Sequence, residues 1–152
     1  MLDRPCDFRD LLPPRGSLLG LDMSQRRIGV AGTDVERRLV TPLLTLQRDK
    51  WARDCGRLAG LVKEREAVGL VLGLPLNMDD SEGPAAQRTR DWARNLGKAL
   101  RLPLLLQDER LTSSAVSFAI EEGRLPRPKK GQLLDHYAAA VILEDALRAM
   151  AG

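Results

Sequence analysis

Acidic side chains occur in this sequence at places where strands and packed helix faces usually carry apolar ones. Asp22 lies near the end of the apolar run 17–23, although aspartate is depleted from strands. Asp135 shares a helical face with Ala138 and Ala139, so its carboxylate is expected on the packed side of that helix. A lone buried carboxylate is strongly destabilising unless a partner compensates its charge. Both acids are therefore candidates for a site with a partner or a bound cation.

A pair of acids, Asp108 and Glu109, follows the apolar run 103–107. Open α/β sheets bind their ligands at the carboxyl ends of the strands. Successive side chains of a strand point to opposite faces of the sheet. We therefore expect one of these two acids to face a site shared with Asp22 and Asp135.

Three carboxylates brought together from separate elements would repel one another, and their pKa values would rise unless divalent cations neutralised them. Sites made of carboxylates alone favour Mg²⁺ or Mn²⁺ over zinc. Two such ions, about 3.5–4 Å apart, can activate a water and stabilise the leaving oxygen of a phosphodiester. The set thus predicts a metal-dependent nuclease. Each acid taken alone could instead cap a helix or form a turn.

The size and composition of the chain exclude several classes of protein. Its 152 residues correspond to about one domain, and 43% hydrophobic with 30% charged residues is typical of a globular protein. Cys6 and Cys55 belong to no CxxC motif, which argues against a zinc site and a disulfide framework. No apolar run approaches the ~20 residues that cross a bilayer, and the N-terminus lacks the pattern of a signal peptide. We expect a soluble, cytoplasmic protein with no membrane partner.

Hydrophobic periodicity predicts an α/β fold. Residues 1–15 contain three prolines and no period, so we expect an extended arm, followed by a single domain over 16–152. The predicted strands are 17–23, 26–33, 39–46, 67–75 and 103–107, and the predicted helices are 50–66, 85–100, 112–122 and 133–150. Pro42 marks the third strand as an edge or a bulge. This order implies a mixed five-stranded sheet, three antiparallel strands followed by two parallel ones, flanked by helices.

Basic residues bracket the candidate acids along the chain. They are Arg26 and Arg27 after the first strand, and Arg127, Lys129 and Lys130 in the loop before the last helix. The net charge of +3 is too small to establish nucleic-acid binding. Evidence for such binding has to come from where the charges lie. These side chains could hold the phosphates of a polyanion. They could equally be ordinary solvated residues that keep the protein soluble.

Other polar and aromatic residues admit simpler interpretations. Asn77 lies between a buried strand and the start of a helix, where backbone N–H groups can bind an anion, but it could also form a structural turn. His136 is turned by about 100° from Asp135 on a helix, which argues against a role as a ligand. Trp51 and Trp92 recur at helical spacing with apolar residues, and we expect them in the core rather than as platforms on which bases stack.

Four motifs together resemble the YqgF/RuvX family of Holliday junction resolvases and pre-16S ribosomal RNA nucleases. They are LGLDMSQRRIGVA (19–31), VLGLPLNMDDSEGPAA (71–86), LLQDERLTSSAV (105–116) and LDHYAAAVIL (134–143). The resemblance spans roughly residues 17–150. It implies a ribonuclease H-like fold and a divalent-metal nuclease whose three acids correspond to Asp22, Glu109 and Asp135. Ser24 stands where the family usually has glycine, so we expect an altered turn after the first strand.

The resemblance implies maturation of the 16S ribosomal RNA precursor as the cellular role, with Holliday junction resolution second. Its partner would be precursor RNA or branched DNA, and the protein would be a monomer or a weak homodimer. A rival from another class is a non-catalytic nucleic-acid-binding module with the same fold. A third reading takes GLDMSQRRIGV as the phosphate loop of an actin-like ATPase. Such ATPases need two domains, and this chain is about one domain long.

Overall fold

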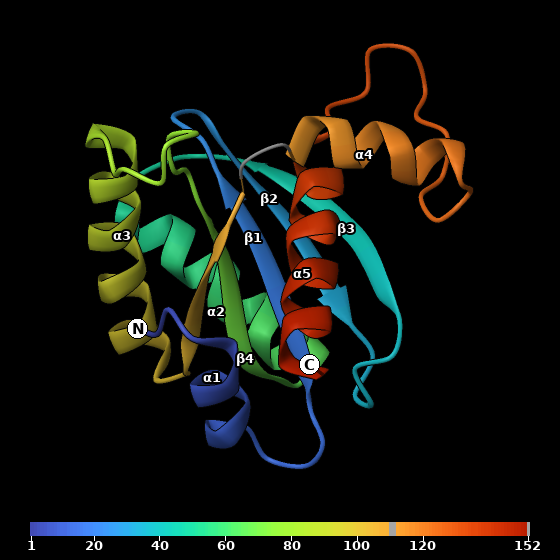
Figure 1. Ribbon diagram of the computed structural model, residues 1–152. Helices are drawn as coiled ribbons and strands as arrows, with labels where there is room; N and C mark the ends of the chain where they lie inside the picture. The colour runs from blue at the N-terminus through green and yellow to red at the C-terminus, as the bar shows by residue number, and fades with distance from the viewer. Residues whose placement is uncertain (110–111, 152) are drawn as a thin grey trace.

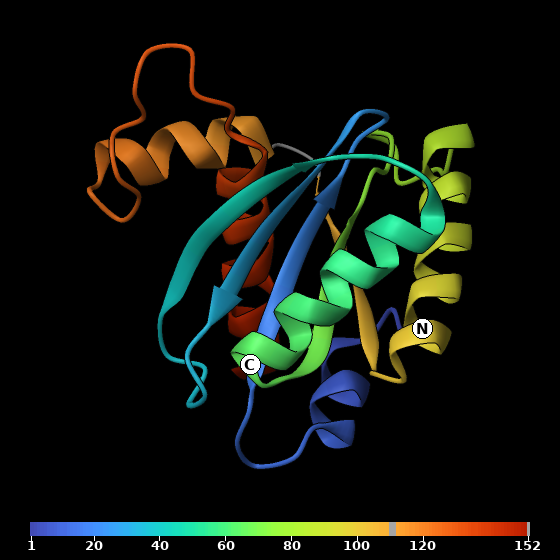
Figure 2. The ribbon, with the colours of Figure 1, turned by 180° about the vertical axis from the view of Figure 1, so that it is seen from behind.

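A computed structural model of the protein describes residues 1–109 and 112–151. Helices cover both faces of a mixed sheet whose strand order is β3-β2-β1-β4-β5 (Figures 1 and 2). The strands are β1 (Ser17–Met23), β2 (Arg27–Thr33), β3 (Val40–Gln47), β4 (Ala67–Leu74) and β5 (Leu104–Asp108). The helices are α1 (Pro5–Leu11), α2 (Trp51–Arg65), α3 (Pro84–Leu100), α4 (Thr112–Glu121) and α5 (Asp135–Ala151). Among the residues described, no helix has both the length and the apolar character that a membrane crossing requires.

The sheet joins an antiparallel half to a parallel half, which confirms the predicted arrangement. β1 pairs antiparallel with β2, and β2 with β3, whereas β4 runs parallel to both β1 and β5. Pro42 lies on the edge strand β3 next to a register shift, where Val30 pairs with Leu44 and Ala31 with Pro42. Proline cannot donate to the ladder, so an edge or a bulge is where a strand tolerates it. Here it has both.

The two faces of the sheet have separate apolar cores. Leu18, Val71 and Leu105 face α5, whereas Leu19 and its alternating neighbours face α2 and α3. Figure 1 shows α5 lying across β1 and β2, and Figure 2 shows α2 on the opposite face. Because side chains alternate along a strand, Asp22 is on the same face as Leu18, the face that α5 covers. The strand register thereby decides which helix can contribute to a site around Asp22.

The N-terminal segment is part of the fold, so the prediction of an extended arm is wrong for residues 5–11. These residues form α1, with Pro5 at the first helical turn, where a missing N–H costs nothing. Phe8 is fully buried against the core beneath α5. Before the helix, Leu2 pairs with the edge strand β5, donating to the Leu104 carbonyl at 2.8 Å. α1 is too short to show a hydrophobic period in the sequence, and burial of the Phe8 ring holds it in place.

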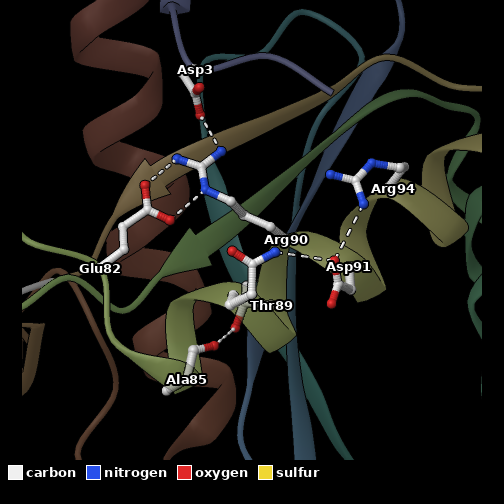
Figure 3. Close-up of polar contacts among 8 residues, drawn as sticks. Asp3, Glu82, Ala85, Thr89, Arg90, Asp91 and Arg94 are labelled. Carbon is white, nitrogen blue, oxygen red and sulfur yellow. Dashed lines mark hydrogen bonds and ion pairs between the residues drawn. The ribbon is translucent and has the colours of Figure 1, made fainter.

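Arg90 on α3 ties two loops to that helix (Figure 3). Its guanidinium donates to both carboxylate oxygens of Glu82, at 2.6 and 2.8 Å, and to Asp3 at 3.2 Å. A bidentate pair of this kind fixes geometry as well as charge. The segment after β4 and the N-terminus are therefore both held against α3.

Replacing Phe8 with alanine tests whether α1 belongs to the core. We expect Phe8→Ala to lower the free energy of unfolding by about 3–5 kcal/mol, because it leaves a cavity under α5. Urea titration followed by circular dichroism measures the change. Leu11→Ala on the same helix is the control, since Leu11 is 60% exposed and should cost less than about 1 kcal/mol. Equal effects of the two substitutions would contradict the packing described.

Candidate active site

Asp22 is held by the strand register near the end of β1. It pairs with Gly29 of the neighbouring strand β2 and is half-buried. Its side chain lies on the α5 face of the sheet, beyond the small residue Gly20, onto which α5 packs closely. The carboxylate therefore emerges where the covered face of the sheet gives way to solvent.

Glu109 is fixed by backbone contacts on both sides. Its N–H donates to the Leu74 carbonyl at 3.2 Å, and its own carbonyl accepts from the Thr112 N–H at 3.3 Å and from the Thr112 hydroxyl. The side chain lies over Gly73 of β4, where a Cβ would come within 2.7 Å of Glu109 Oε2. Only the absence of a side chain at position 73 lets this carboxyl group reach the α5 face.

Asp135 begins α5 directly above β2. A Cβ on Gly29 would overlap the backbone carbonyl of Asp135, and it would lie 2.7 Å from the His136 nitrogen. Gly29 therefore permits the closest approach of helix to sheet in this region, at the strand position that pairs with Asp22. The side chain of Asp135 is 13% exposed and accepts a hydrogen bond from Arg27 Nε at 2.9 Å.

The structure places all three predicted acids at one end of the sheet but joins only two of them directly. The carboxyl groups of Asp22 and Glu109 are hydrogen-bonded to each other, and the charge of Asp135 acts on Asp22. Asp135 itself is engaged by Arg27. Within residues 1–109 and 112–151, no three His, Cys, Asp or Glu side chains form a group that could hold a metal ion as they stand.

Burial and mutual repulsion raise the pKa values of the joined pair. Desolvation is the main cause that raises the pKa of Glu109 to about 9, with further contributions from the hydrogen bond and charge of Asp22 and from the charge of Asp108. Burial also raises the pKa of Asp22, and Asp135 adds to this, while the hydrogen bond from Glu109 opposes it. Burial therefore favours the protonated form of this pair, in which Glu109 donates its hydrogen bond to Asp22.

The hairpin after β1 closes without glycine at position 24, and the expectation that this turn differs from that of the family stays a prediction. Ser24 does not adopt a positive φ. Its N–H donates to the Arg27 carbonyl at 2.9 Å, and its hydroxyl accepts from the Arg27 N–H at 3.1 Å. A serine hydroxyl can satisfy a turn in this way. Arg26 is exposed at the tip of this turn, whereas Arg27 points back to Asp135.

The other predicted substrate contacts lie in two loops. Arg127, Lys129 and Lys130 are exposed on the segment between α4 and α5, which extends beyond the end of the sheet (Figures 1 and 2). The base of this segment is anchored by the Tyr137 hydroxyl, which donates to the Pro126 carbonyl at 2.8 Å. Asn77 forms a structural turn: its side-chain amide donates to Ser81 Oγ at 2.9 Å.

His136 turns away from the acids, as its position on the helix predicts. Its Nδ1 is 2.8 Å from Thr45 Oγ1 on β3, and its ring packs edge-on against Tyr137. Burial lowers the pKa of His136, against the opposing charge of Asp135. The imidazole therefore connects the start of α5 to the edge strand β3.

A cleft beside Glu109 contains two arginines, Arg48 and Arg88, that no sequence pattern points to. Its volume is about 510 Å³, and its lining includes Ser24, Arg48, Arg88, Trp92 and Glu109. The expectation of a core position is wrong for Trp51, which is 40% exposed. It is only partly correct for Trp92, because that residue is half-buried and lines this cleft. Trp92 makes an edge contact with Trp51 at 6.2 Å between ring centres. No periodicity or motif in the sequence connects Arg48 with α3.

Solved nuclease structures share this arrangement of sheet and helices. The chain is similar to Thermus thermophilus RuvC in complex with a Holliday junction substrate, with a TM-score of 0.59 and 12% identity over 90% of this chain and 96% of the other. It is also similar to the fowlpox virus Holliday junction resolvase, with a TM-score of 0.53 and 13% identity over 89% and 98% of the two chains. The protein therefore has the ribonuclease H-like fold, and the predicted fold class is confirmed.

Sequence comparison assigns the family. The RuvX family, described as Holliday junction resolvase, matches residues 16–149. A protein of Cereibacter sphaeroides named "Putative pre-16S rRNA nuclease" is 48% identical over 93% of this chain and 88% of its own length. A protein of Rhodobacter capsulatus with the same name is 48% identical over 95% and 91% of the two chains. The chain belongs to the RuvX family, which confirms the resemblance found in its motifs.

The raised pKa of Glu109 makes the stability of the protein depend on pH. Below the ordinary value of 4.5 both folded and unfolded chains hold this proton, and between 4.5 and about 9 only the folded chain does. The unfolding free energy contributed by this group is therefore present at low pH and is lost as the pH rises toward 9. We expect Glu109→Gln to flatten this decline in urea titrations from pH 5 to pH 9. Glu64→Gln, an exposed control, should keep the wild-type slope; parallel curves for all three proteins would refute the shift.

Gly29 is expected to be indispensable for the position of Asp135. Gly29→Ala should lower the free energy of unfolding by about 1–3 kcal/mol, because a methyl group there overlaps the first turn of α5. Gly60→Ala is the control: position 60 has open space around it in α2, and alanine should stabilise that helix by roughly 1 kcal/mol. Thermal unfolding compares the two. A Gly29→Ala protein as stable as wild type would show that α5 does not begin against β2.

Proposed function

We propose that this protein is a divalent-metal-dependent nuclease that hydrolyses phosphodiester bonds during processing of the 5′ end of the 16S ribosomal RNA precursor. The observation that carries the proposal is the hydrogen-bonded pair of buried carboxyl groups, Asp22 and Glu109, with Asp135 beside it. Membership of a nuclease family and the names of relatives that are 48% identical support the same function. Ribosomal RNA processing would place the protein in the cytoplasm.

The donor set fits Mg²⁺ or Mn²⁺ in its chemistry. All candidate ligands are carboxylate oxygens, and these hard ions prefer such oxygens. The proton held between Asp22 and Glu109 takes the place that a cation would otherwise fill, since both relieve the same repulsion. Asp22, Glu109 and Asp135 would hold the metal, with Asp135 released by Arg27. When bound, a pair of such ions activates a water and stabilises the leaving oxygen of the phosphodiester.

The surrounding basic side chains would hold the substrate. Arg26 at the hairpin tip is exposed on one side of the acids, and Arg127, Lys129 and Lys130 are exposed on the loop before α5. Contacts of this kind bind phosphates and fix the position of a strand without reading its bases. Arg27 would leave Asp135 and join them once the carboxylate has another cation. Asn77, held in its turn, would contribute a contact at the rim of the site.

Holliday junction resolution is the second candidate function. The family is described by this activity, and the fold matches that of a RuvC solved with a Holliday junction. Both activities use the same hydrolytic chemistry, so they differ in the substrate rather than in the acids. A non-catalytic nucleic-acid-binding module with this fold is the remaining alternative.

Cleavage assays with acid-to-amide variants test the nuclease proposal. We expect the purified protein to cleave a labelled 16S precursor RNA with Mg²⁺ or Mn²⁺, and Asp22→Asn and Glu109→Gln to reduce the rate at least about a hundredfold. The amides keep the shape of the side chains but remove the charge that compensates a cation. Denaturing gels measure the rate, and a labelled four-way DNA junction is assayed in parallel.

Matched controls separate loss of chemistry from loss of charge. Asp10→Asn on α1 and Glu64→Gln on α2 remove carboxylates at exposed positions outside the candidate site, and both should leave the rate unchanged. Faster cleavage of the junction than of the RNA would assign the protein to junction resolution. If the wild-type protein binds both substrates and cleaves neither, it is a binding module.

A further inference from the structure

The cleft beside Glu109 lies outside the group of acids and is assembled from separate segments. One wall is the tip of the β1–β2 hairpin, and the other is the first part of α3. Arg48 completes the hairpin wall, where its Nη1 donates to the Ser24 carbonyl at 2.8 Å. Glu109 is itself part of the lining, so a strand bound in the cleft would reach the candidate active site.

The charges in this cleft favour an anion. Arg48 and Arg88 both line it, and Arg88 is exposed on α3. Asp91, an acid in the lining besides Glu109, is compensated by Arg94 on the same helix at 3.3 Å. Two guanidinium groups on opposite walls present hydrogen-bond forks suited to phosphate.

The size and the aromatic wall of the cleft limit what it can take. A volume of about 510 Å³ is within the ~300–1,000 Å³ of pockets that hold small molecules, so it suits a nucleotide rather than a duplex. Trp92 lines the cleft and is held from the side by Trp51. Aromatic side chains beside basic ones are the usual platform for single-stranded nucleic acid, because every base can stack on a ring.

We propose that this cleft binds unpaired nucleotides of the RNA strand next to the bond that is cut. Arg48 and Arg88 bind the backbone phosphates, and Trp92 stacks with a base. This inference rests on the proposed function and adds a preference: the substrate has a single-stranded segment entering the site from the α3 side.

Binding of a labelled oligonucleotide tests the cleft. The probe is a fluorescein-labelled single-stranded RNA of about twelve nucleotides, measured by anisotropy with Mg²⁺ on the Asp22→Asn background, which prevents cleavage. We expect Arg88→Ala to weaken binding about tenfold and to lower the slope of log affinity against log salt by about one. Trp92→Leu should weaken binding about tenfold with an unchanged slope, because it removes stacking rather than charge.

Controls address charge, folding and the stacking contact. Lys98→Ala removes a charge from an exposed position of α3 outside the cleft, and it should change affinity less than twofold. A blunt RNA duplex should bind equally to wild type and Arg88→Ala.

In a Trp51→Phe protein, the fluorescence of Trp92 should be quenched by the single strand. Thermal unfolding verifies that Trp92→Leu is folded, and Arg88→Ala tests the proposal independently because position 88 is exposed.

The outcomes distinguish this inference from the nuclease proposal. If Arg88→Ala binds the single strand as tightly as Lys98→Ala and cleaves as fast as wild type, the cleft proposal is wrong and the nuclease assignment stands. If Arg88→Ala weakens binding but the wild-type protein cleaves no RNA or DNA, the cleft binds nucleic acid and the nuclease proposal is wrong.

Discussion

The structure depends on holding two carboxyl groups, Asp22 and Glu109, against each other where water is partly excluded. Ionising both would set like charges side by side in a region of low dielectric constant, so one proton or a cation has to accompany the pair. The two carboxyl groups stay close together despite their repulsion because backbone hydrogen bonds fix both residues. Asp22 is held by its pairing with β2, and Glu109 is held between the end of β4 and the start of α4. The pair is therefore set before any ligand arrives.

Two strand glycines make the arrangement possible. Gly73 leaves room for the Glu109 side chain, and Gly29 lets α5 begin in contact with β2. Arg27 then compensates Asp135, the third acid, through a bond of 2.9 Å. The ion pair between Arg27 and Asp135 and the proton on Glu109 both reduce the repulsion among the three carboxylates. A divalent cation would replace both of them. Under the proposed function, metal binding would be coupled to release of a proton and of an arginine side chain.

The basic groups around the acids fall into two sets that lie on different sides of the sheet. The loop before α5 extends beyond the α5 side (Figures 1 and 2). The cleft is lined by residues of the hairpin and of α3. The hairpin tip carries Arg26 between them. Under the proposed function, both sets would contact phosphates of one substrate.

Sequence patterns alone indicated the meander, the alternation of helices and strands, and an edge or bulge at Pro42, because each depends on residue type and local spacing. They also marked Asp22, Asp135 and the pair Asp108 and Glu109 as candidate acids, and only the family resemblance chose Glu109 from that pair. The resemblance of four motifs to a known family also lies in the linear chain. Tertiary structure decided what local spacing cannot: Phe8 orders a helix where prolines suggest an arm, Arg27 pairs with Asp135 from 108 residues away, and Arg48 faces α3 across a cleft. These contacts join residues far apart in the chain, and only the packing of the sheet and helices brings them together.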